Sequence, residues 1–197
     1  KIRVAHCGLG QWGPNLLRNL GQSDACEVVA ICDRDEARLS EFGAKHPGAR
    51  LYSDVSQVAG DAGVHAVVLA TPAGLHAKQT RMLLDAGKDV LVEKPLAMDI
   101  DSARELVDLA RKRGRLLMVG HTFLFNEAVR RVKQEIDRGT LGDLRLIQAE
   151  RLSLGRIRED CNALWNLAPH DVSILLYWLG EMPHRVSARG FAFHEGH

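Results

Sequence analysis

Short apolar runs alternate with amphipathic stretches over the first 120 residues of the chain. Most of these runs are continuous, which is typical of strands buried on both faces. They fall at residues 2–7, 27–32, 65–70, 89–92 and 116–119, with a shorter one near 50–52. The stretches between them carry apolar residues at helical spacing, most clearly at 99–113. Strands alternating with helices predict a doubly wound parallel sheet with helices on both faces.

The pattern changes after about residue 120. The elements expected there are helices at 126–137 and 168–179, the latter with Pro169 in its first turn, and strands at 143–152 and 185–193. Two strands leave exposed edges and a thin core, so this region is interpreted as incomplete. The chain thus predicts an α/β fold with a doubly wound parallel sheet over 1–121, followed by an incomplete α+β domain over 122–197.

Composition narrows the class of protein. The 197 residues are 46% hydrophobic and 26% charged, with a formal net charge of +1, values ordinary for a globular protein. Such a balance gives no reason to expect nucleic acid or an anionic membrane surface as a partner. No apolar run approaches the roughly 20 residues that span a bilayer. The chain passes from Lys1 straight into a strand without a visible signal peptide, so we expect a cytoplasmic protein.

Cysteine usage argues against a metal site. Cys7, Cys26, Cys32 and Cys161 form no C-x-x-C pair, and we interpret them as reduced thiols. The tail at 194–197 (HEGH) is one residue short of the H-E-x-x-H spacing that places two histidines on one helix face. We therefore expect no bound metal.

A glycine-rich turn, Gly8-Leu9-Gly10-Gln11-Trp12-Gly13, follows the first strand. In this pattern the first glycine allows a tight turn, the second lets the backbone approach a pyrophosphate, and the third lets the helix pack on the sheet. The helix N-terminus then offers free N–H groups to phosphates. Gly8, Gly10, Gln11, Trp12 and Gly13 are therefore predicted to bind a dinucleotide.

An acidic residue is expected about 20 positions further on, where it would bind the adenosine ribose. Asp33 stands there, at the end of the second strand. Its carboxylate would repel a 2′-phosphate, which favours NAD over NADP, although Arg34 beside it weakens that preference. The alternatives are a glycine turn without a ligand, or an S-adenosylmethionine site, which nothing else in the chain supports.

A lysine follows the strand at 89–92, within the sequence Glu93-Lys94-Pro95. Ligands of open α/β sheets bind outside the carboxyl ends of the strands. The glycine turn, Thr71-Pro72 and Glu93-Lys94 all follow strands of the predicted sheet and so converge at that edge. Lys94 is accordingly a candidate functional residue, whereas the structural alternative is a surface lysine in a turn.

Taken together, these segments resemble the Gfo/Idh/MocA family of dehydrogenases. The resemblance is carried by GLGQWG (8–13), Asp33, ATPAGLHA (70–77), EKPLA (93–97), GHTFLFNEAVRR (120–131) and WNLAPHD (165–171). It implies an N-terminal Rossmann domain, a C-terminal domain with a large open sheet, and a tightly held NAD or NADP. It also implies oxidation or reduction of a sugar or polyol carbon, and a homo-oligomer, dimer or tetramer. The chain is much shorter than the family's usual form.

The same resemblance assigns roles to individual residues. Lys94 matches the family's catalytic lysine and Glu93 the position near the nicotinamide ribose. Thr71, Pro72 and His76 match the loop beside the cofactor.

His170 matches the histidine of a second motif, D-x-x-x-H, in which Asn166 replaces the usual Asp. Asn can hydrogen-bond a hydroxyl but cannot take its proton. Alternatively, Asn166 caps the helix that begins near Pro169, and His170 is a buried histidine without chemistry. Asp171 is a candidate to orient or charge His170, although neighbouring side chains on a helix diverge.

These observations lead to one functional hypothesis and two alternatives. In the first, His170 acts as acid/base and Lys94 polarises the substrate oxygen, or the two exchange roles, in an NAD-dependent dehydrogenase of a sugar, sugar acid, nucleotide-sugar or cyclitol. The alternatives are an NAD-dependent glycosidase of the same fold and a non-catalytic NAD-binding regulatory module.

Overall fold

The computed structural model of the protein describes residues 1–152 and 161–191. Its backbone contacts divide the chain into two compact units, Lys1–Gly120 and His121–His197, called here the first and second units. Each is described by itself.

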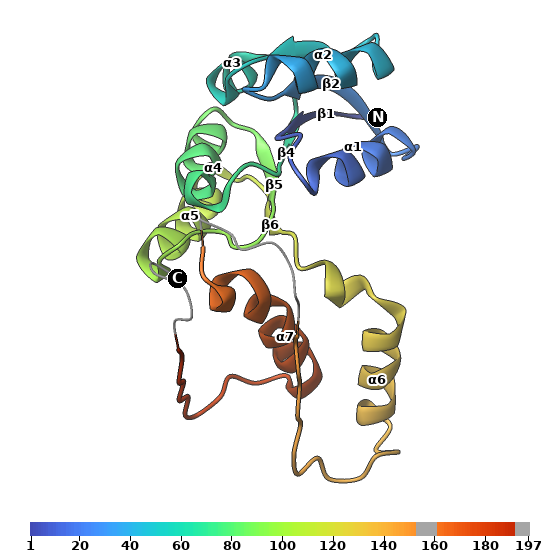
Figure 1. The fold of residues 1–197 in the computed structure, drawn as a ribbon, viewed down its shortest axis with the longest axis vertical. Helices are drawn as coiled ribbons and strands as arrows, with labels where there is room; N and C mark the ends of the chain where they lie inside the picture. Colours follow the sequence, from blue (N-terminus) through green and yellow to red (C-terminus); the bar gives the residue numbers. More distant parts are fainter. Residues whose placement is uncertain (153–160, 192–197) are drawn as a thin grey trace. The chain divides into compact units, whose positions relative to one another are not determined.

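The first unit contains a six-stranded parallel sheet (Figure 1). Its strands are β1 Ile2–Cys7, β2 Cys26–Cys32, β3 Arg50–Tyr52, β4 Ala66–Leu69, β5 Asp89–Val92 and β6 Leu117–Val119. They lie in the order β3-β2-β1-β4-β5-β6, and every neighbouring pair is parallel. The predicted doubly wound sheet is confirmed, and the expected strands agree with these bounds to within about one residue.

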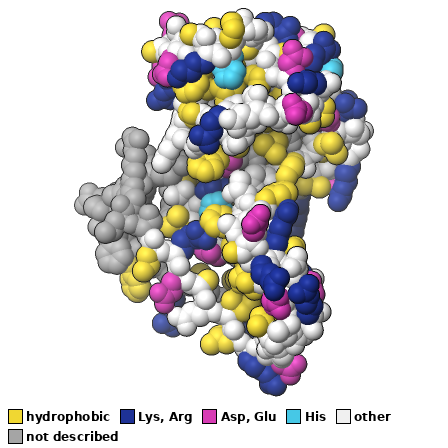
Figure 2. All heavy atoms as spheres, turned by 90° about the vertical axis from the view of Figure 1, so that its right-hand side faces the viewer, with side chains coloured by type: hydrophobic (Ala, Val, Ile, Leu, Met, Phe, Trp, Pro, Cys, Tyr) yellow, Lys and Arg dark blue, Asp and Glu magenta, His cyan; other side chains and the backbone are white. Residues whose placement is uncertain are grey.

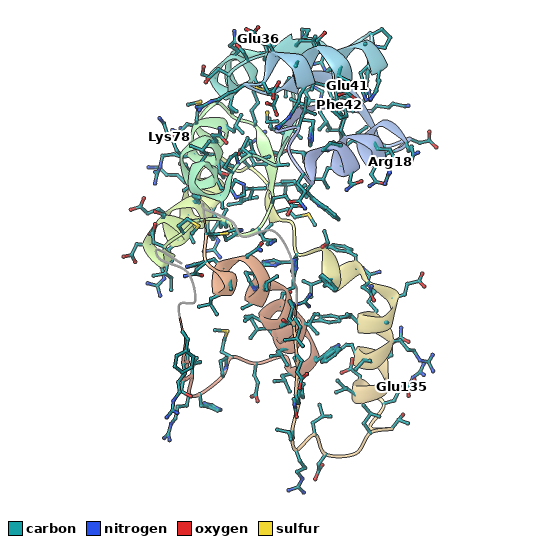
Figure 3. All side chains as sticks on the ribbon, in the orientation of Figure 1. Arg18, Glu36, Glu41, Phe42, Lys78 and Glu135 are labelled. Carbon is teal, nitrogen blue, oxygen red and sulfur yellow. The ribbon has the colours of Figure 1, made fainter. Side chains whose placement is uncertain are left out.

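Helices connect the strands. They are α1 Gly13–Gly21, α2 Glu36–Lys45, α3 Val55–Gly60, α4 His76–Asp85 with the 3-10 turn η1 Ala73–Leu75 before it, and α5 Ile100–Arg113. Asp99 caps α5 by accepting a hydrogen bond from the Ser102 amide, and Gly114 ends it in the left-handed region at φ 62°. Polar residues such as Arg18, Glu36 and Lys78 lie on the outer surfaces of these helices (Figure 3).

The core of the first unit lies between the central strands and the helices α3, α4 and α5. The buried residues of α4 are His76, Thr80, Leu83 and Leu84, which is the spacing of one helix face. A smaller cluster of Leu9, Leu17 and Ile31 packs α1 against the sheet. His76 lies on the same face of α4 as these core residues, and its side chain is therefore buried.

Helices make up the regular structure of the second unit, as far as the structure describes it. They are the 3-10 turn η2 Thr122–Phe125, α6 Glu127–Asp137 and α7 Ala163–Leu179. Asn126 caps α6 by accepting from the Ala128 and Val129 amides. The indole N–H of Trp178 donates to the carbonyl oxygen of Val129 at 2.9 Å and ties α7 to α6.

Two predicted strands were wrong in this unit. Residues 144–152 and 185–191 adopt no strand, while 192 and 193 lie outside the described residues. A strand needs a neighbouring strand to pair its backbone, and no such neighbour is found for them among the described residues. Leu146, Leu152 and Val186 are accordingly exposed, at 81%, 89% and 78%.

The start of α7 also differs from the prediction. The helix begins at Ala163, and the Asn162 side chain caps it by accepting from the Trp165 amide at 3.0 Å. Asn166 is therefore not a cap, and Pro169 lies inside the helix rather than in its first turn. Asn162 provides the stronger start signal because its side chain reaches a free amide of the first turn.

Charges of both signs are interspersed over the visible face in Figure 2, in keeping with the net charge of +1. Within residues 1–152 and 161–191, no helix is long and apolar enough to cross a membrane.

Candidate functional site

The candidate site of the first unit is built at the carboxyl edge of its sheet. Backbone pairing continues one residue beyond the strands, because the Gly8, Ala70, Glu93 and Gly120 amides donate to strand carbonyls at 2.7–2.8 Å. The residues that follow β1, β4, β5 and β6 are thereby fixed side by side along one edge. β1 and β4 are neighbours at the centre of the sheet, and the order in which strands are added reverses between them. Open α/β sheets bind ligands at such a point.

The three glycines of the turn meet different surroundings. Gly8 has φ +99°, and a Cβ on it would lie 2.5 Å from the Ala70 carbonyl group. A Cβ on Gly13 would lie 1.9 Å from the Gly8 carbonyl oxygen. A Cβ on Gly10 would meet no described atom within 4 Å. The protein's own packing requires glycine at 8 and 13, while at 10 it leaves open space beside the backbone.

Asp33 anchors the turn to the end of β2. One of its carboxylate oxygens accepts from the Leu9 amide, and the other accepts from the Asp35 amide at 2.8 Å. Its own amide donates to the Tyr52 carbonyl oxygen at 3.1 Å. A carboxylate has about four acceptor positions, so these bonds leave capacity for hydroxyl donors. Arg34, which follows it, is exposed.

His6 is a residue that the sequence analysis missed. Its side chain is fully buried in β1, and Nε2 lies 2.9 Å from the Gly8 carbonyl oxygen. Because a carbonyl only accepts, Nε2 carries the proton of this hydrogen bond. Burial lowers the pKa of His6 to about 4, although the bond to Gly8 acts in the opposite direction. The ring is thus a neutral support beneath the glycine turn; the signal for it was a histidine inside an otherwise apolar strand.

We expect His6 to make the protein acid-sensitive. Its folded pKa of about 4 lies below the ordinary 6.5, so the unfolded chain binds more protons between these values. Stability should fall as the pH drops from about 6.5 to about 4, by about 3 kcal/mol in total. Urea unfolding at about pH 7 and about pH 5 should show a smaller acid loss for His6→Gln than for the wild type. Equal losses would contradict this assignment, and the exposed His184→Gln serves as control.

His76 joins the segments that follow β4 and β5. Its Nε2 lies 2.8 Å from the Thr71 carbonyl oxygen and its Nδ1 lies 2.7 Å from that of Pro95. The Thr71 hydroxyl donates to the Gln79 side chain at 2.6 Å, and Pro72 precedes η1. The imidazole is 1% exposed, so it acts here as an internal tie beside the Lys94 segment.

Glu93 and Lys94 follow β5 at the same edge. Glu93 Oε2 accepts from the Lys94 amide at 3.3 Å, and a Cβ on Gly120 would lie 3.0 Å from Glu93 Oε1. Gly120 therefore leaves the room that this carboxylate occupies. Burial raises the pKa of Glu93, while the Lys94 amide, the Lys94 ammonium and the Trp12 indole favour its charged form. Lys94 is half-buried, and its bond to Pro95 is cis.

His170 and Asn166 belong to the second unit. Both lie on α7, one turn apart, so they share a helix face. The His170 ring packs on Phe123 of η2 with centroids 4.8 Å apart. Asp171 forms an ion pair with Arg151 at 2.7 Å, so its carboxylate is committed to that guanidinium. The charge of Asp171 also acts on His170, which is one of the two roles predicted for it.

Metal ligands are not assembled in the part of the chain that the structure describes. Over 1–152 and 161–191, no group of three or more His, Cys, Asp or Glu side chains is arranged to hold a metal ion. The tail at 194–197 lies outside the described residues.

The fold and the turn together define a class of protein. A six-stranded parallel sheet in this order, with a glycine turn after β1 and an acid after β2, is a dinucleotide-binding Rossmann domain. Residues 2–121 match the family model described as the oxidoreductase family with an NAD-binding Rossmann fold, Gfo/Idh/MocA, and the chain belongs to this family. The resemblance found in the sequence is confirmed.

Two of the curated relatives that the chain matches are named as dehydrogenases. The chain is 30% identical to a 4-carboxy-2-hydroxymuconate-6-semialdehyde dehydrogenase of a Sphingobium strain, over 96% of this chain and 62% of that protein. It is 38% identical to the inositol 2-dehydrogenase of Mycolicibacterium smegmatis, over 72% of this chain and 41% of that protein. The chain spans about half the length of the curated relatives that it matches.

Solved structures show the same fold. A point mutant of a 3-ketoreductase from Actinomadura kijaniata, in complex with TDP-benzene and NADP, has a TM-score of 0.68 and 34% identity, covering 73% of this chain and 44% of that one. The apo scyllo-inositol dehydrogenase from Lactobacillus casei has a TM-score of 0.69 and 26% identity, covering 73% and 43%.

Proposed function

We propose that the protein transfers a hydride between NAD(H) and a hydroxyl or keto carbon of a sugar, nucleotide-sugar or cyclitol. The observation that carries the proposal is the position of Lys94. It lies two residues after β5, at the edge where the glycine turn and Asp33 follow β1 and β2. The relatives named as inositol dehydrogenase and 3-ketoreductase support this class of substrate.

The residues of the first unit fit a dinucleotide. The space beside Gly10 and the N-terminus of α1, which has no side-chain cap among the described residues, suit a pyrophosphate. Asp33 would accept from the adenosine ribose, and Glu93 from the nicotinamide ribose. Gln11, Trp12, Arg34, Thr71 and Pro72 complete the proposed cofactor contacts, and His76 supports the Thr71 segment from inside the protein. A bound nicotinamide supplies the hydride acceptor or donor.

The protein's own groups manage the proton and the substrate. Lys94 binds and polarises the substrate oxygen, and His170 takes or returns the hydroxyl proton, as imidazole can near neutral pH. Lys94 and His170 can exchange these two roles. Asn166 hydrogen-bonds a substrate hydroxyl without taking its proton.

The coenzyme is proposed to be NAD rather than NADP. A carboxylate at position 33 repels a 2′-phosphate and accepts from a free 2′-hydroxyl. A dimer or tetramer belongs to the same proposal and rests on the family resemblance alone. A cytoplasmic location is proposed with it and rests on the free cysteines, which we interpret as reduced thiols.

The test is a coenzyme-coupled assay of the purified protein. Inositols, free sugars and nucleotide-sugars are offered with NAD or NADP, and formation of the reduced coenzyme is followed by its absorbance. We expect net NADH formation with at least one substrate and a lower KM for NAD than for NADP. Dinucleotide binding with no turnover across the panel would favour the regulatory module, and glycoside cleavage without net NADH would favour the glycosidase.

A further inference from the structure

His170 is packed in a cluster of the second unit that the sequence did not predict. The cluster, called here the Arg151 cluster, consists of Phe123, Arg151, His170 and Asp171. The Phe123 ring contacts the His170 ring, with centroids 4.8 Å apart and planes inclined by 57°. The Arg151 guanidinium carbon lies 5.0 Å from the centroid of the same Phe123 ring. One aromatic ring thus links the guanidinium to the imidazole.

Arg151 also holds the residue beside His170. Its Nε donates to Asp171 Oδ2 and its Nη2 donates to Asp171 Oδ1, both at 2.7 Å. Such two-point pairs between guanidinium and carboxylate are directional as well as charge-assisted. Their side chains are 28% and 25% exposed, so water only partly screens the pair. The pairing raises the pKa of Arg151 and lowers that of Asp171, so both groups stay charged.

The contacts come from three separate stretches of chain. Phe123 belongs to η2, Arg151 to the irregular stretch after α6, and His170 and Asp171 to α7. Successive side chains on a helix point about 100° apart, so His170 and Asp171 leave α7 in different directions. Arg151 nevertheless contacts both Asp171 and the Phe123 ring that packs on His170. Arg151 reaches His170 by two routes, through Phe123 and through the α7 backbone at Asp171.

We propose that Arg151 is a positioning residue that holds the His170 imidazole through Phe123 and through Asp171. The proposal rests on the acid/base role proposed for His170. Arg151 does not touch the substrate in this proposal; it fixes the direction of the ring and adds its charge to the ring's surroundings.

The charges around His170 make the proposal testable through the protonation of its imidazole. Asp171 interacts electrostatically with His170, which lowers the pKa of Asp171, and the same attraction must favour the protonated imidazole. The positive charge of Arg151, which lies over the Phe123 ring, must disfavour the protonated imidazole. Of the elements packed on α7, η2 has no charged residue and is preceded by His121. On α6, Arg131 pairs with Glu135 and Lys133 with Asp137, within that helix. Of its other charged residues near the start, Glu127 is exposed and Arg130 lies over the Phe125 ring.

The test is a titration of the His170 imidazole by NMR, with its signal assigned from His170→Gln. Arg151→Met leaves the Asp171 charge unopposed, so the His170 midpoint should rise by about half a pH unit. Asp171→Asn leaves the Arg151 charge unopposed, so the midpoint should fall by a similar amount. The double variant should return towards the wild-type value. Arg145→Met is the matched control, because Arg145 and Asp143 form a pair that is 84% and 85% exposed.

Midpoints that move in the same direction in both variants, or that do not move, would overturn the proposal. A folding defect is recognised by near-ultraviolet circular dichroism, and Arg151→Lys, which keeps the charge, should then retain the wild-type midpoint. In turnover, Arg151→Met should lower kcat about tenfold with little change in KM. The titration needs neither substrate nor coenzyme. Opposite shifts without any turnover would therefore contradict the proposed function and not the positioning role.

Discussion

Replacing Lys94 by alanine is expected to lower kcat by about 10²–10⁴-fold, the range lost with a general acid or base. The ammonium is proposed to polarise the substrate oxygen, so its removal affects the chemical step. Dinucleotide binding should change little, because the turn, Asp33 and Glu93 remain. Turnover measures the first effect, and calorimetric titration with NAD measures the second.

Lys78→Ala is the matched control for this variant. Lys78 is an exposed lysine on α4 and lies on the outer surface of the helix (Figure 3). Its removal should leave both turnover and NAD affinity at wild-type values. If Lys94→Ala retained near-normal turnover, the proposed role of Lys94 would be wrong, even with NAD bound.

Gly13→Ala should destabilise the protein by about 3 kcal/mol or more, at the upper end of overpacking substitutions. The new Cβ would lie 1.9 Å from the Gly8 carbonyl oxygen and 3.2 Å from His6 Nε2. The first neighbour is backbone fixed by the sheet, so the start of α1 has to move. Urea unfolding at neutral pH measures the loss.

Gly10→Ala should separate stability from binding. Its Cβ meets no described atom within 4 Å, so unfolding should be unchanged. The methyl group would occupy the space assigned to the pyrophosphate, and NAD affinity should fall at least about tenfold, or about 1.4 kcal/mol. Gly48→Ala, which is equally open, should affect neither quantity. Unchanged NAD affinity in Gly10→Ala would contradict the proposal that the pyrophosphate binds beside this glycine.

The first unit could be predicted from sequence because its signals are local. Each strand is a short apolar run, and the helix 99–113 carries its own start at Asp99 and its own stop at Gly114, as the structure shows. The glycine turn, Asp33 and Lys94 were expected at one edge of the sheet, because the carboxyl ends of parallel strands meet there. None of these inferences needed a contact between distant residues other than strand pairing.

The second unit could not be predicted as well, because its structure depends on distant partners. Leu144 and Leu146 alternate with polar residues as in a strand, but a strand forms only beside another. Arg151 and Asp171 lie 20 positions apart, and no periodicity indicates their pairing. The support that His6 gives to Gly8 depends on burial, which a single histidine in the sequence does not reveal.

The two hydrogen bonds that the Asp33 carboxylate accepts from backbone amides have a consequence for protein engineering. A switch of coenzyme preference towards NADP requires removal of the acid after the second strand, because its charge repels a 2′-phosphate. In this chain the same carboxylate accepts a hydrogen bond from the Leu9 amide, so its removal would also release the glycine turn. A redesign towards NADP would have to supply a substitute acceptor for Leu9 before any gain in selectivity became visible.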